Sequence, residues 1–234
     1  MGGWVAVSVF GDAPKESAER STRVSLCPTF AELIALRAGT EASLAVDIPM
    51  GLLETVKPRP CDEQARKLLG HRASTVFAPP SRPLLAAASY SDARALVDES
   101  RKTEPAAKSL SAQAFALAPK IKEADDWLRS HEGAQNWLFE CHPELSFRAI
   151  ADGRVLDDKK TSHGQVDRVR LIAHEFPDAL DVIAETRLSS KDAQLADLLD
   201  AYAAADSAMH VAAGDYEELG GETDGAGLIM RMVC

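Results

Sequence analysis

Residues 43–53, SLAVDIPMGLL, decide the fold class that the sequence predicts. The apolar run over residues 44–48 is typical of a buried strand, and Pro49 and Gly51 end it abruptly. Asp47 therefore lies near the carboxyl end of a strand, where open α/β sheets bind their ligands. Because an unpartnered buried carboxylate costs roughly several kcal/mol, we predict that Asp47 has a local partner or takes part in chemistry.

The segments before and after this strand alternate between strand and helix patterns. Residues 4–10 and 22–27 are rich in valine and predict two paired strands, and Thr29 precedes a helical pattern with Glu32 at the capping-box position. Helices are also expected over residues 61–70, 91–101, 111–131, 142–150, 164–176 and 194–213, a strand over 136–141, and a Gly-rich tail after the last helix. The alternation predicts an α/β fold with a mixed sheet flanked by helices.

The chain of 234 residues is long enough for one sizeable core, and 46% hydrophobic residues exclude a mainly disordered protein. We expect a single domain over residues 1–234, with a proline-rich excursion at about 55–83 and a helical insertion at about 91–131. No apolar run is long enough for a membrane span, and residues 1–10 lack the features of a signal peptide. The four cysteines show no CxxC pair. These features predict a cytoplasmic protein with reduced cysteines and no membrane partner.

Several acids occur where strands or helices end or begin. They are Asp47, Glu140 and Glu144 in FECHPE, and Asp197, Asp200 and Asp206 near the chain's last helix. Converging carboxylates are what Mg²⁺ or Mn²⁺ requires. Each acid also has a simpler interpretation: Glu144 suits the first turn of a helix, and Glu140, Asp197 and Asp200 could be solvated. Asp206 falls on the apolar stripe of its helix, so it is either paired or functional.

The basic residues have two interpretations as well. Arg59, Arg66, Arg72 and Arg82 in the proline-rich excursion could bind phosphate or form salt bridges. Lys120 and Lys122 fit a solvated helix face, and the loop KKTSHG, with Lys159 and Lys160, could contact a nucleic-acid backbone or be an ordinary loop. The motifs of zinc peptidases, P-loop enzymes, dinucleotide-binding proteins and α/β-hydrolases are absent.

Five sequence blocks in order carry a family resemblance. The blocks are VDIPMGL, CDEQARKLLGHRASTVFAPPSR, LSAQAFALAPKIKEADDWL, FECHPELSFRAI with KKTSHG, and DLLDAYAAA. Together they resemble the family called domain of unknown function 429, whose members are predicted nucleases of ribonuclease-H-like fold. The resemblance runs from about Trp4 to the C-terminus. It implies that Asp47 and Asp200 are metal ligands and that Glu140 and Glu144 complete the catalytic site. The helical pattern alone favours Asp206 over Asp200; we predict that Asp200 is the ligand and that Asp206 is a buried neighbour or supports the site.

The beginning of the chain departs from the family pattern. In the family pattern, a strand that ends in Gly-Val-Asp-Gly precedes the segment that corresponds to GGWVAV, whereas this sequence starts at MGGWVAV. Either the natural protein starts further upstream, or it has lost a metal ligand and a central strand and is inactive. Since loss of a central strand would leave a row of backbone groups unpaired, we expect the upstream start. Asp12 is an imperfect substitute for the missing aspartate, because it follows the next strand.

The leading hypothesis is a metal-dependent nuclease that uses Mg²⁺ or Mn²⁺, with Arg72, Arg82, Lys120 and Lys160 holding phosphates. The net charge of −10 argues against a protein that coats duplexes, but it allows a local basic groove. The alternatives are a non-catalytic scaffold that binds a protein or small ligand, and a hydrolase of small phosphate compounds. The sequence leaves the substrate and the oligomeric state open.

Overall fold

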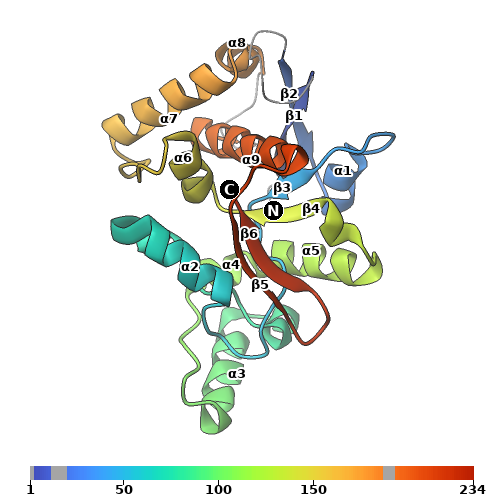
Figure 1. Ribbon diagram of the computed structural model, residues 1–234. Coiled ribbons are helices and arrows are strands. Elements are labelled where there is room, and N and C mark those ends of the chain that lie inside the picture. Colours follow the sequence, from blue (N-terminus) through green and yellow to red (C-terminus); the bar gives the residue numbers. More distant parts are fainter. Residues whose placement is uncertain (1–2, 12–19, 187–192) are drawn as a thin grey trace. The chain divides into compact units, whose positions relative to one another are not determined.

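The computed structural model describes residues 3–11, 20–186 and 193–234 (Figure 1). The described residues fall into two compact units. Unit 1 consists of Met1–Asp47, Trp137–Glu217 and Val233–Cys234, and unit 2 of Ile48–Asn136 and Glu218–Met232. The first boundary follows Asp47 directly, and unit 2 contains both the proline-rich excursion and the helical insertion. The expectation of a single ribonuclease-H-like domain stays a prediction.

The first two strands of unit 1 form the antiparallel pair that the valine-rich segments predict. Strand β1 (Trp4–Phe10) pairs with β2 (Ser21–Cys27), from Trp4 opposite Cys27 to Phe10 opposite Ser21. Helix α1 (Phe30–Ala35) follows, and the Oγ1 atom of its N-cap, Thr29, accepts the backbone N–H of Glu32 at 3.2 Å. This side chain satisfies an N–H group that has no partner within the helix.

The strand predicted over residues 44–48 is shorter in the structure. Strand β3 (Leu44–Val46) pairs in parallel with β4 (Leu138–Cys141), and Val46 lies opposite Glu140. Asp47 therefore follows the strand, rather than lying within a strand that reaches Ile48. The predicted α/β class is confirmed, with both antiparallel and parallel strand pairs.

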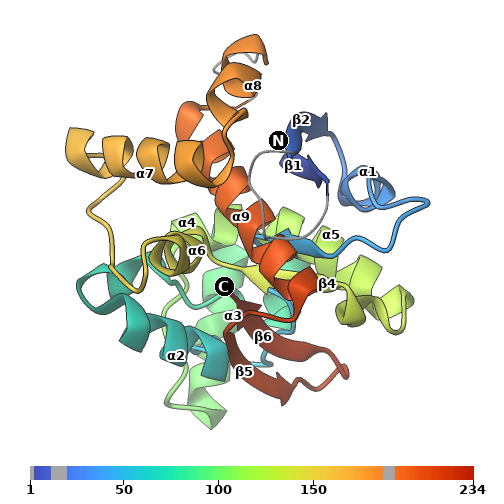
Figure 2. The same ribbon diagram turned by 45° about the horizontal axis from the view of Figure 1, so that its top comes forward.

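Helices pack around these strands of unit 1. They are α6 (Pro143–Ile150), α7 (Ser162–Glu175), α8 (Ala179–Glu185) and α9 (Leu195–Ala213). Helix α9 contacts β1, β3 and β4, and it also contacts α6 and α7 (Figures 1 and 2). Its buried Tyr202 packs with Phe147 and Phe176 in the largest described cluster of this unit. Helix α8 was not expected, because its seven residues are too few for a clear helical pattern.

Unit 2 is mainly helical between residues 48 and 136. It contains α2 (Pro60–Leu69), the 3₁₀ helices η2 (Gly70–Thr75) and η3 (Arg82–Ala86), α3 (Tyr90–Thr103), α4 (Ala112–Ala116), α5 (Ala118–Ser130) and η4 (Ala134–Asn136). The prediction of one helix over residues 111–131 was wrong, because the helix is interrupted at Leu117. Pro119 has no N–H group to donate to Phe115, so the first helix cannot continue through it.

The Gly-rich tail, to which the sequence analysis assigned no secondary structure, lies in a pair of strands and the turn that joins them. Strand β5 (Glu218–Thr223) and β6 (Ile229–Val233) are joined by a turn in which Asp224 accepts backbone N–H groups. Gly220 has a φ of +86°, and a Cβ atom there would lie 2.4 Å from the Met230 carbonyl oxygen. Glycine at this position therefore permits a close approach of two backbones. Glycine-rich composition alone suggests a loop here rather than a strand.

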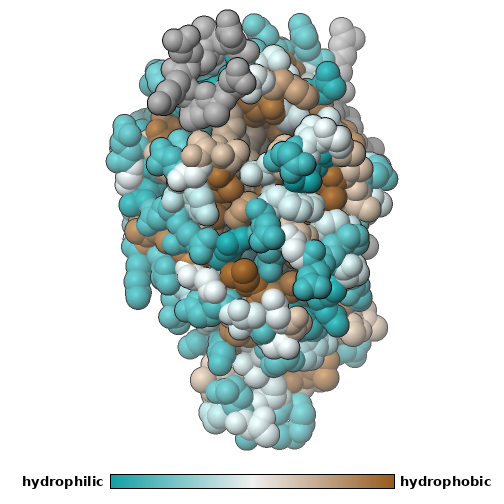
Figure 3. Space-filling view, turned by 45° about the vertical axis from the view of Figure 1, so that its right-hand side comes forward, coloured by the Kyte–Doolittle hydropathy of each residue, from teal (hydrophilic) through white to brown (hydrophobic). Residues whose placement is uncertain are grey.

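On the face shown in Figure 3, hydrophilic residues predominate and hydrophobic residues form small separate patches. Within the described ranges, no helix has both the length and the apolar character needed to cross a membrane.

Candidate acidic site

The acids singled out in unit 1 gather at the carboxyl ends of two strands and at the start of α9. Asp47 follows β3, and its side chain is exposed. Parallel strands end at the same edge of a sheet, so the residues after Glu140 in β4 lie at this edge too. Asp200 lies in the second turn of α9, which packs against both strands, and its side chain is 17% exposed.

Lys159 is a cation of this cluster. It lies in the loop before α7, and its Nζ atom donates to the Oδ2 atom of Asp200 at 2.7 Å. Desolvation lowers the pKa of Lys159, but Asp200, Asp47 and Glu144 together raise it above the ordinary lysine value. One ammonium group thus interacts with three carboxylates that come from different segments of the chain.

The two central carboxylates have raised pKa values. Asp47 keeps an exposed surface, but the groups packed around its carboxylate desolvate it, and this desolvation is the main cause of its raised pKa; His142 and Lys159 lower the pKa, and Asp200 raises it further. Desolvation is also the main cause for Asp200, where Lys159 lowers the pKa and Glu144 raises it. An acid whose pKa is raised by low solvation and by a second carboxylate is stabilised when a cation binds to it.

Glu144 is held by an arginine that the sequence analysis did not single out. The Nη2 atom of Arg168 donates to the Oε2 atom of Glu144 at 2.7 Å, and both side chains are buried. The Nη1 atom donates to the carbonyl oxygens of Asp157 and Gly164, and the guanidinium lies 5.1 Å from the Phe147 ring centroid. Gly164, Arg168 and Ile172 form the buried face of α7, so a charged residue at helical spacing with apolar ones was the available signal.

Glu140 lies in β4 and is buried, with 3% of its surface exposed. Its charge, with those of Asp47 and Asp200, raises the pKa of the buried Cys141 thiol after the dominant effect of desolvation. Glu140 is therefore a buried group in β4, which differs from the solvated edge residue that one interpretation offered.

Asp206 lies elsewhere on α9, with different neighbours. It is buried, and its Oδ2 atom is 3.8 Å from the Nε2 atom of His210. The other charged groups that shift its pKa are Glu175 and Arg20. Of the two helix acids, Asp200 is the one grouped with Asp47, as the resemblance implies, and Asp206 is buried, as its place on the apolar stripe suggests. Asp12 lies outside the described residues.

Replacement Asp206→Asn should change the pH dependence of stability. Burial raises the pKa of Asp206 from 3.8 to about 6, against the opposing effect of His210. The folded state then binds this proton more tightly than the unfolded chain does, so its contribution is full below pH 3.8 and is lost as the pH rises to about 6. At ~1.4 kcal/mol per pH unit, the contribution is about 3 kcal/mol at most.

Urea unfolding at pH 4, 6 and 8 measures this effect. The asparagine variant should unfold with a free energy that changes less than that of the wild type between pH 4 and 6, and it should be the more stable protein at pH 8. The exposed Asp126→Asn provides the control. Parallel pH profiles for wild type and Asp206→Asn would contradict the assignment.

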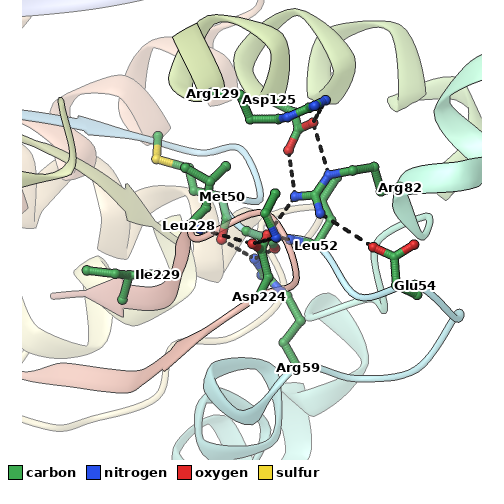
Figure 4. A network of polar contacts seen from close by, with 12 residues as sticks. Met50, Leu52, Glu54, Arg59, Arg82, Asp125, Arg129, Asp224, Leu228 and Ile229 are labelled. Atoms are coloured by element: carbon green, nitrogen blue, oxygen red, sulfur yellow. Dashed lines mark hydrogen bonds and ion pairs between the residues drawn. The ribbon is translucent and has the colours of Figure 1, made fainter. Parts of the chain in front are cut away.

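Three of the predicted phosphate-binding residues lie in unit 2: Arg72 in η2, Arg82 in η3 and Lys120 in α5. Arg82 contacts carboxylates of its own unit, Asp125 at 3.0 Å and Asp224 at 2.6 Å (Figure 4). These contacts favour the salt-bridge interpretation for this arginine. Lys160 is exposed and lies beside Lys159 in unit 1. Phosphate binding by Arg72, Lys120 and Lys160 stays a prediction.

The donor set around Asp47 suits a hard cation in its chemistry. Residues 3–11, 20–186 and 193–234 contain no group of three or more His, Cys, Asp or Glu side chains that could hold a metal ion. Asp47 and Asp200 nevertheless provide carboxylate oxygens, and Mg²⁺ is commonly bound through one or two carboxylates while it keeps several waters. An ion held by these two acids alone would take its remaining ligands from water or substrate.

The fold and the site together define an α/β protein with an acidic cluster at the carboxyl ends of parallel strands. The family model described as "Protein of unknown function (DUF429)" matches residues 1–224, and the chain belongs to this family. No curated protein and no solved structure matches the chain.

Proposed function

We propose that the protein is a divalent-metal-dependent phosphodiesterase of ribonuclease-H-like fold that acts on nucleic acid. The observation that carries the proposal is the contact between Asp200 and the Lys159 ammonium group, supported by the effects of Asp200 and Lys159 on the pKa of Asp47. These acids come from a strand end and from a helix more than a hundred residues later in the chain. The parallel pair of β3 and β4 beneath α9 supports the fold assignment.

In this proposal, Asp47 and Asp200 hold Mg²⁺ or Mn²⁺. The bound ion would activate water and neutralise charge that develops on the phosphoryl group. Asp47 is exposed and therefore accessible to substrate, whereas the buried Glu140 supports the site from the strand. Arg168 fixes the carboxylate of Glu144 in one orientation. His142 lowers the pKa of Asp47 and so favours the ionised form that a cation requires.

The substrate follows from the charges around the site. The net charge of −10 disfavours binding along extended duplex DNA, so contacts to phosphate must be local. The exposed Lys160, next to Lys159, is placed for such a contact in unit 1. A nuclease should cleave a polymer with steep salt dependence, a hydrolase of small phosphate compounds should not need a polymer, and a scaffold should cleave neither.

Binding of Mn²⁺ measured by calorimetry tests the proposal without knowledge of the substrate. The wild-type chain should bind Mn²⁺ saturably, and Asp200→Asn should lose this binding, because one of two charged ligands becomes neutral. Asp126→Asn is the matched control, since this exposed acid also forms an ion pair with a lysine. Equal binding by the wild type and Asp200→Asn would show that the metal lies elsewhere, and the absence of binding in both would refute the proposal.

A further inference from the structure

Lys159 has an unusual position for a lysine in a polar loop. Its side chain is 41% exposed, yet its Nζ atom lies 2.7 Å from the Oδ2 atom of Asp200. The charges of Asp47 and Glu144 also raise the pKa of Lys159. Isolated surface ion pairs contribute little, but a cation shared by three carboxylates offsets repulsion among all of them.

The backbone on both sides of Lys159 is held in place by α7. The Thr161 N–H and Oγ1 groups both donate to the Asp158 carbonyl oxygen, at 2.9 and 2.8 Å. The Nη1 atom of the buried Arg168 donates to the Asp157 carbonyl oxygen at 2.9 Å. The loop therefore presents Lys159 to the carboxylates from a fixed backbone.

The first turn of α7 also restricts this loop. A Cβ atom at Gly164 would lie 2.3 Å from the Asp158 carbonyl oxygen, so the loop backbone rests directly on the helix at a position that excludes a side chain. The ion pair of Lys159 is thus part of a tightly packed region, unlike the exposed pair of Lys122 with Asp126.

We propose that Lys159 is the built-in counter-cation of the site formed by Asp47 and Asp200, and that a divalent cation binds there by displacing its ammonium group. This inference rests on the proposed function. In the metal-free protein the ammonium offsets repulsion between the carboxylates. A divalent ion carries twice the charge and prefers carboxylate oxygens, so it competes for Asp200. Because displacement of Lys159 opposes metal binding, the ion would bind most tightly when a substrate phosphate supplies further ligands.

Titration of the full-length, metal-free protein with Mn²⁺ tests the competition. Lys159→Met should bind Mn²⁺ about 10-fold more tightly than the wild type, because removal of one nearby positive charge is worth on the order of a tenfold change in affinity. Lys159→Arg keeps the charge and should bind like the wild type. Lys122→Met removes an exposed lysine–aspartate pair of the same kind and should also leave the affinity unchanged.

Thermal melting of the same proteins provides a second readout. Metal-free Lys159→Met should melt at a lower temperature than the wild type, because its carboxylates have lost their counter-charge, and Mn²⁺ should raise its melting temperature more. Lys159→Gln, titrated in parallel, replaces the methionine variant if that protein does not fold.

The outcomes separate the two proposals. If the wild type binds Mn²⁺ in an Asp200-dependent manner but loss of the Lys159 charge leaves the affinity equal or weaker, the counter-cation role is overturned and the proposed metal site stands. If neither the wild type nor the Lys159 variants bind, both proposals are overturned. Binding that appears only when the charge of Lys159 is removed would show that the wild-type ammonium group is not displaced by the metal, and it would overturn both proposals.

Discussion

Asp47→Asn is expected to lower metal-dependent cleavage of nucleic acid by about 1,000-fold, since loss of a metal ligand removes several kcal/mol of transition-state stabilisation at ~1.4 kcal/mol per factor of ten. The asparagine is nearly isosteric, so the site keeps its shape while the charge that holds the ion is gone. Initial rates on structured and single-stranded RNA and DNA, with Mg²⁺ or Mn²⁺ and with EDTA, measure the effect.

The same substitution should not destabilise the protein. The pKa of Asp47 is raised, mainly by desolvation and then by Asp200, so at neutral pH the ionised form is less favourable in the folded state than in the unfolded chain. A neutral side chain removes that disadvantage. We expect an unchanged or higher melting temperature, with Asp126→Asn as the control for both rate and stability. Wild-type turnover in Asp47→Asn would refute the assignment of this carboxylate.

The separation of activity from stability distinguishes a site residue from a structural one. Replacement of a carboxylate with a purely structural role would lower the melting temperature, because its hydrogen-bond and charge partners would be left unsatisfied. Asp47 has the opposite signature, since its ionised form is disfavoured where it lies. Such unfavourable electrostatics are typical of functional sites.

The sequence predicted the order of the first elements along the chain and the strand end at Asp47 because the signals were local. Valine-rich segments, the Thr29 cap and the break at Pro49 each depend on a few neighbouring residues. The grouping of Asp47 with Asp200 was implied only by the family resemblance, because residues so far apart in the chain carry no mutual pattern. The differences were also local, since the glycines of β5 obscured a strand, and Pro119 at the start of α5 interrupted a helix that periodicity alone had predicted.

Lys159 shows why site chemistry is harder to predict than the fold. In the sequence, Lys159 and Lys160 are equivalent members of a basic loop. The structure separates them, because Lys159 reaches Asp200 across the fold while Lys160 is exposed. Only a long-range contact distinguishes the two lysines. Arg168 differs in this respect, since its place on the buried face of α7 could have been recognised from the helical spacing of its neighbours.

Arg82→Met is expected to lower the free energy of unfolding by about 3–5 kcal/mol, the usual cost of removing one partner of a buried ion pair. The guanidinium contacts Asp125 through Nε and Nη2, Asp224 at 2.6 Å, and Glu54 at 3.6 Å (Figure 4). The Asp125 and Asp224 side chains are 3% and 0% exposed, so water cannot replace the arginine without rearrangement.

The network explains the size of this effect because it connects distant segments of unit 2. Arg82 begins η3, Asp125 lies in α5, and Asp224 closes the turn after β5. Asp224 also accepts the backbone N–H of Leu52 at 2.8 Å. Loss of the guanidinium would therefore leave two buried carboxylates close together and weaken three tertiary connections at once.

The pH dependence gives this prediction its sharpest test. Desolvation acts to raise the pKa of Asp224, but the Arg82 hydrogen bond and backbone donors outweigh it and lower the pKa below 3.8. The stabilisation is therefore full above the unfolded-state pKa and is lost as the pH falls through the lower folded-state value. Urea unfolding should show the largest difference between wild type and Arg82→Met near pH 7 and a smaller one near pH 3.

A surface ion pair in the same unit serves as the control. Lys102→Met removes a lysine whose side chain and that of its partner Glu99 are both exposed, so it should cost less than about 1 kcal/mol. If Arg82→Met costs no more than this control, or if its effect is independent of pH, the buried network does not stabilise unit 2. Phosphate binding would then regain its place as an explanation for Arg82.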